Sequence, residues 1–75
     1  MNIKAIVDEL LENTFCDQYG EESTRFWLTE ATKADVNQQV FWLERLGEVE
    51  LGTLTLDEVT DAVWAALLEE RKVNA

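Results

Sequence analysis

Residues 55–72 read TLDEVTDAVWAALLEERK and contain the start, the buried face and the end of a helix. Thr55 and Glu58 have the capping-box spacing, in which a hydroxyl and a carboxylate bind free amides of the first turn. Apolar residues then recur at intervals of three and four, at Leu56, Val59, Val63, Ala66 and Leu67. The last two residues are basic, and positive charge is favourable at the carboxyl end of a helix dipole. We therefore predict a helix over 56–72.

A second helix is predicted over 33–46, upstream of the first. Thr32 and Asp35 have a capping-box-like spacing at its start. Its apolar face comprises Val36, Val40, Leu43 and Leu46. Gly47 follows, and glycine is the preferred residue for the left-handed conformation that ends many helices. The residues between the two helices alternate acidic and apolar but are bounded by glycines, so we expect a connector there rather than a strand.

The N-terminal part of the chain also has helical periodicity. Its apolar residues share one face, at Ile3, Ile6, Val7, Leu10, Leu11 and Phe15, which predicts a helix over 2–15. Residues 16–24 contain Gly20 and have no apolar period, which predicts a loop. Segment 24–30, TRFWLTE, suits a short strand by its aromatic content or a short helix capped by a hydroxyl side chain, and we favour the helix.

These elements predict an all-α fold, a small compact bundle of three to four helices in a single domain over residues 1–75. The chain is 47% apolar, so its 16 acidic residues, against 6 basic ones, belong to a folded surface rather than to a disordered tail. A domain of this size buries about 60% of the surface that its unfolded chain exposes, so its stability should be modest.

Catalysis and cofactor binding are disfavoured by what the chain lacks. Without histidine it has neither the commonest general base near neutral pH nor an imidazole metal ligand. Its 3 glycines are too scattered for a phosphate-binding loop. Asp17, Glu21 and Glu22 surround Gly20 as in a calcium loop, but Leu28 occupies the position of the bidentate glutamate. We expect no enzyme activity, no cofactor and no metal site.

The sequence also predicts a compartment. A secreted domain of this size usually has an even number of cysteines, so the lone Cys16 favours a reducing cytoplasm. The N-terminus lacks a signal-peptide pattern, and no apolar run approaches the length of a membrane span. A net charge of −10 is repelled by anionic lipid and by phosphates. We expect a cytoplasmic protein that binds neither membrane nor nucleic acid directly.

The chain has more aromatic side chains than so small a core needs. A rotation of about 100° per residue places Phe41 well away from the apolar face of its helix. The same rotation places a second stripe beside the buried face of the last helix. Two interpretations stay open: other segments cover these aromatics, or the aromatics form a contact site whose surrounding charge steers association. The candidate partner-binding residues are Asp57, Asp61, Trp64, Leu68, Phe41, Glu21 and Glu22.

Together these features predict a non-enzymatic acidic protein that regulates or inhibits a basic protein partner. Nucleic-acid-handling proteins such as polymerases, nucleases and repressors are the partner class that we favour, since they must neutralise phosphates. In size, charge and helicity the whole chain resembles small acidic regulators and inhibitors of phages and other mobile elements, some of which imitate the charge of nucleic acid. The alternative is a structural or assembly subunit that buries its aromatics in a homo-oligomer, with a homodimer as the simplest case.

Overall fold

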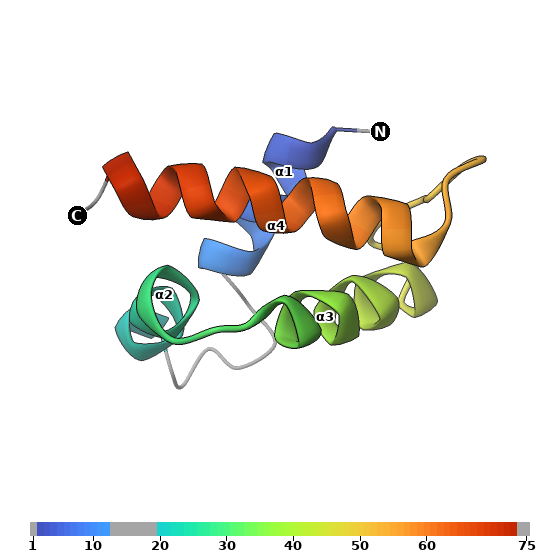
Figure 1. The fold of residues 1–75 in the computed structure, drawn as a ribbon. Helices are drawn as coiled ribbons and strands as arrows, with labels where there is room; N and C mark the ends of the chain where they lie inside the picture. The colour runs from blue at the N-terminus through green and yellow to red at the C-terminus, as the bar shows by residue number, and fades with distance from the viewer. Residues whose placement is uncertain (1, 13–19, 74–75) are drawn as a thin grey trace.

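The fold is described from a computed structural model, which defines residues 2–12 and 20–73 (Figure 1). In that part of the chain four helices follow one another without a strand, which confirms the predicted all-α bundle. They are α1 (Ile3–Glu12), α2 (Gly20–Thr29), α3 (Lys33–Arg45) and α4 (Leu56–Val73). None of these helices is both long and apolar enough to cross a lipid bilayer.

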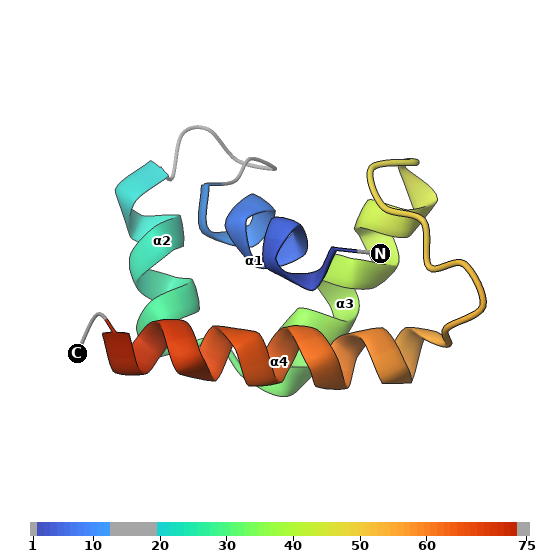
Figure 2. The same ribbon diagram turned by 90° about the horizontal axis from the view of Figure 1, so that it is seen from above.

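α4 is the longest of these helices, with 18 residues, and it contacts each of the other three. Figures 1 and 2 show α4 crossing the whole molecule, with α3 beside its first half and α2 near its last turns. α1 packs against both α4 and α2. The segment with the strongest helix signals in the sequence therefore forms the helix against which the other three pack.

One core lies between the helices. Its buried apolar residues are Ile6, Val7, Leu10, Trp27, Ala31, Val36, Val40, Leu43, Val59, Val63 and Leu67. Most of them belong to the apolar faces predicted for α1, α3 and α4. Trp27 of α2 is buried as well, so α2 completes the core and is not a loosely attached segment.

Both predicted capping boxes are present. At the start of α3, Asp35 N donates to Thr32 Oγ1 at 3.3 Å, and Thr32 N donates to Asp35 Oδ2 at 2.8 Å. At the start of α4, Glu58 N donates to Thr55 Oγ1 at 3.1 Å, and Thr55 N donates to Glu58 Oε1 at 3.2 Å. Each box satisfies amides that have no acceptor inside the helix.

α3 ends in the glycine motif that the sequence predicts. Gly47 has a φ of 77° and donates to Glu44 O at 3.1 Å, while Glu48 N donates to Leu43 O at 2.9 Å. This pair of bonds is a Schellman motif. Leu46, predicted to belong to the apolar face, is instead 59% exposed. That prediction was wrong because Leu46 is the cap residue, where the chain already leaves the helix.

α2 begins earlier than predicted. The helix favoured over 24–30 is confirmed, but it starts at Gly20, within the segment predicted to be a loop. Glu21 and Glu22 fall in its first turn, where acidic residues interact favourably with the helix dipole, and the loop prediction overlooked this signal. The predicted end of the first helix near residue 15 and the start of the expected loop lie outside the described residues.

Candidate interaction surface

Two of the predicted site residues lie in a groove between α3 and α4. The groove has a volume of about 440 Å³ and is lined by Lys33, Ala34, Asn37, Asp57, Thr60 and Asp61. Lys33 forms an ion pair with Asp61, and Asn37 Nδ2 lies 3.4 Å from Asp57 Oδ1 as a donor. Both carboxylates therefore already have partners within the protein, and a basic ligand at this groove would have to compete with them.

Trp64 and Leu68 continue the stripe along α4 toward α2. Trp64 is half-buried, and the Arg71 guanidinium lies 5.1 Å from the centroid of its ring. The same guanidinium donates to Trp27 O at 3.0 and 3.2 Å and to Ala31 O at 2.7 Å, which ties the end of α2 to α4. Trp64 thus supports the packing of the fold, and its role in a partner contact stays a prediction.

Both aromatic residues of α3 are poorly covered, whereas the helical spacing predicts this position only for Phe41. Phe41 is 37% exposed and Trp42 is 46% exposed, and their rings meet edge to face at 5.5 Å. Arg45 lies over the Phe41 ring at 5.5 Å. Glu21 and Glu22 lie on α2, away from α3 along the chain, and their side chains are outside the described part of the structure.

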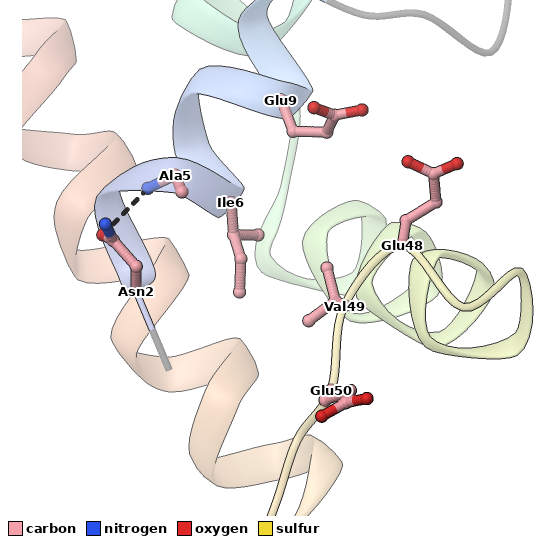
Figure 3. Close-up of a pocket in the computed structure, with 7 residues that line it drawn as sticks. All are labelled: Asn2, Ala5, Ile6, Glu9, Glu48, Val49 and Glu50. Carbon is pink, nitrogen blue, oxygen red and sulfur yellow. Dashed lines mark hydrogen bonds between the residues drawn. The ribbon is translucent and has the colours of Figure 1, made fainter.

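A second cavity lies where the N-terminal end of α1 meets the α3–α4 connection (Figure 3). Its volume is about 390 Å³. The cap residue Asn2 and three residues of α1, Ala5, Ile6 and Glu9, line one side, and the connection contributes Glu48, Val49 and Glu50. Figure 3 shows Ile6 and Val49 facing each other across the cavity, with Glu9 and Glu48 at one end and Glu50 at the other. We call this cavity the acidic pocket.

Local sequence signals position both walls of the acidic pocket. Asn2 Oδ1 accepts from Ala5 N at 3.1 Å, so Asn2 caps α1 and fixes its first turn. On the other wall, the Schellman motif at Gly47 turns the chain out of α3. The connection then alternates, so that Val49 is half-buried against the core while Glu48 and Glu50 are exposed. The alternation seen in the sequence therefore places the apolar side chain against the core and the acidic side chains in solvent, without forming a strand.

The acidic pocket differs from the α3–α4 groove in its electrostatics. None of the carboxylates of Glu9, Glu48 and Glu50 forms an ion pair or hydrogen bond with a described residue. Lys4, which lies on α1, instead pairs with Asp8 at 3.5 Å. Among the described side chains no group of three or more potential ligands is arranged to hold a metal ion. The pocket is suited to an organic cation whose aliphatic part lies on Ile6 and Val49.

Sequence reasoning missed the acidic pocket as a site. The alternation of Glu48 and Glu50 with apolar residues was visible, but Glu9 lies far away along the chain and on another element. Only the packing of the connection against α1 brings these carboxylates together. The three-residue spacing of Ile6 and Glu9 places them on one side of α1, but it does not relate them to Glu48 and Glu50.

The chain matches no known protein family, no curated protein and no solved structure. Its function is therefore inferred from the chemistry of its surface.

Proposed function

We propose that this protein is a non-enzymatic binding protein that regulates or inhibits a basic protein partner. The acidic pocket is the observation that carries the proposal. Its carboxylates have no cationic partner among the described residues, and its facing walls are apolar at Ile6 and Val49. A lysine or arginine side chain of a partner would supply both the missing charge and an aliphatic stem to lie between those walls.

The distribution of basic residues supports the same proposal. Three ion pairs are present among the described residues, Lys4–Asp8, Lys33–Asp61 and Lys72–Glu69, and all are exposed. Arg71 and Arg45 lie over aromatic rings. Because the chain has 16 acidic residues, these cations do not neutralise its surface. The remaining negative charge would attract a basic protein and increase the rate at which the two proteins associate.

Within the class of basic partners, nucleic-acid-handling proteins are the group that we favour. Their surfaces carry clustered lysine and arginine to neutralise phosphates, and such clusters match a small acidic domain. Binding there would block access of the nucleic acid and so inhibit or regulate the partner.

Homo-oligomerisation is the second candidate function, and the exposed aromatic pair of α3 favours it. Phe41 and Trp42 could be buried between two copies of the chain. The net charge of −10 opposes such an association, because each copy would repel the other at low ionic strength.

The test is affinity capture from a cell lysate with variants of matched charge. Wild type, Glu48→Gln/Glu50→Gln and Asp57→Asn/Asp61→Asn are immobilised, and retained proteins are identified at about 50 and about 500 mM salt. Both double variants remove two negative charges, so non-specific attraction falls equally. We expect basic proteins to be retained by wild type at low salt, released at high salt, and lost with the Glu48/Glu50 variant.

The mass of the free protein in solution completes this test. A salt-resistant oligomer, or a retained set that the Glu48/Glu50 variant leaves unchanged and the Asp57/Asp61 variant abolishes, would contradict a basic partner at the acidic pocket.

A further inference from the structure

Trp42 and Leu46 form an apolar step on the outside of α3. They lie four positions apart, about one helical turn, with Leu46 as the cap residue of α3, and Leu46 N donates to Trp42 O at 2.9 Å. Their side chains are 46% and 59% exposed. Large exposed apolar side chains next to each other are typical of interaction sites, and tryptophan is among the residues that dominate interface energy.

The Schellman motif connects this apolar step to the acidic pocket. Glu48 N is held by Leu43 O, in the last turn of α3, only two residues after Leu46. Glu48 is also a wall of the pocket, opposite Glu9. Leu46, at the end of the apolar step, and Glu48, in the wall of the acidic pocket, are therefore neighbours along the chain at the carboxyl end of α3. We call this surface, made of Trp42, Leu46, Glu48, Glu9 and Glu50, the α3-end surface.

We infer that the α3-end surface binds a basic amphipathic helix of the partner, with an apolar side chain on Trp42 and Leu46 and a lysine or arginine in the acidic pocket. This inference rests on the proposed function and adds the chemistry and the form of the segment that is recognised. An amphipathic helix presents apolar and basic groups about one turn apart, which matches the neighbouring apolar and acidic parts of this surface.

Charge complementarity favours a basic helix over a second copy of the chain as the ligand of this surface. The carboxylates of the pocket have no cation among the described residues, so a basic segment gains favourable pairs. A second copy would bring a further net charge of −10 to a surface that is already acidic. Apolar contact through Trp42 alone would have to overcome that repulsion.

The test uses a defined probe, a fluorescently labelled helical peptide of about 14 residues, or four turns, made only of leucine and lysine. Its affinity is measured by anisotropy for wild type, Trp42→Ala, Leu46→Ala and the control Val73→Ala. Val73 is 80% exposed and is the last residue of α4, outside every candidate site. We expect Trp42→Ala to weaken binding at least about tenfold and Val73→Ala to change it less than about twofold.

A second peptide keeps the lysines and replaces every leucine by serine. We expect it to bind wild type more weakly and to be insensitive to Trp42→Ala, because it cannot use the apolar step. Glu48→Gln/Glu50→Gln should weaken both peptides and reduce the dependence of affinity on salt. Circular dichroism checks that each variant remains helical, and the high exposure of Leu46 makes Leu46→Ala a second variant that should fold normally.

Equal effects of Trp42→Ala and Val73→Ala would overturn the inference, as would a dimer of the free protein that Trp42→Ala dissociates. Neither anisotropy result depends on the lysate capture. Loss of basic proteins with Glu48→Gln/Glu50→Gln but not with Trp42→Ala would support the proposed function while rejecting an amphipathic helix as the ligand.

Discussion

Arg71 links α4 to the end of α2 through one side chain. Its guanidinium donates to the carbonyl oxygens of Trp27, in the last turn of α2, and of Ala31, just beyond that helix, and it also lies over the ring of Trp64. A helix end leaves carbonyl groups without partners inside the helix, and here a planar group with several donors satisfies them from α4. The basic end of α4, predicted to favour its own dipole, thus has a second role in tertiary structure.

Arg71→Lys should lower the free energy of unfolding by about 1 to 2 kcal/mol, because an ammonium cannot reproduce the forked contacts to two carbonyl groups and the stacking on Trp64. Chemical denaturation followed by circular dichroism measures the change. Lys72→Ala is the neighbouring control, since its ion pair with Glu69 is exposed and should contribute less than about 0.5 kcal/mol. Equal losses for the two variants would show that the contacts of Arg71 do not stabilise α2.

The helix ends show which elements could be predicted from the sequence. α3 and α4 were predicted within about one residue because their capping residues act locally, within three positions of one another. The start of α2 was missed because Gly20 was interpreted as a loop residue, although the following glutamates favour a helix start. The acidic pocket was missed because its walls come from distant segments, which no local pattern relates.

Thr55→Ala should destabilise the protein by about 1 kcal/mol, since it removes the hydroxyl that accepts from Glu58 N at the start of α4. Thr53→Ala, two residues earlier at an exposed position, is the matched control and should change stability by less than about 0.5 kcal/mol. The difference between their denaturation midpoints gives the contribution of the cap. A cost for Thr53→Ala as large as that for Thr55→Ala would contradict this account of the helix start.

At the scale of the whole molecule, charge and burial are separated in space. The core between the helices contains one buried polar side chain among the described residues, Thr60, which donates to Leu56 O at 2.7 Å and accepts from Asn37 at 3.0 Å. The carboxylates lie outside, where those of the α3–α4 groove have partners within the chain and those of the acidic pocket have none among the described residues. We therefore propose that the binding site is not defined by overall acidity but by carboxylates without described partners close to exposed apolar groups.

A titration of the isotope-labelled protein with the leucine–lysine peptide, followed through backbone amide shifts in NMR spectra, tests this claim most directly. We expect the largest shifts to cluster at the α3-end surface, around Glu9, Trp42, Leu46 and residues 48–50. Shifts centred instead on Lys33 and Asp61, or spread evenly over every acidic face, would contradict it.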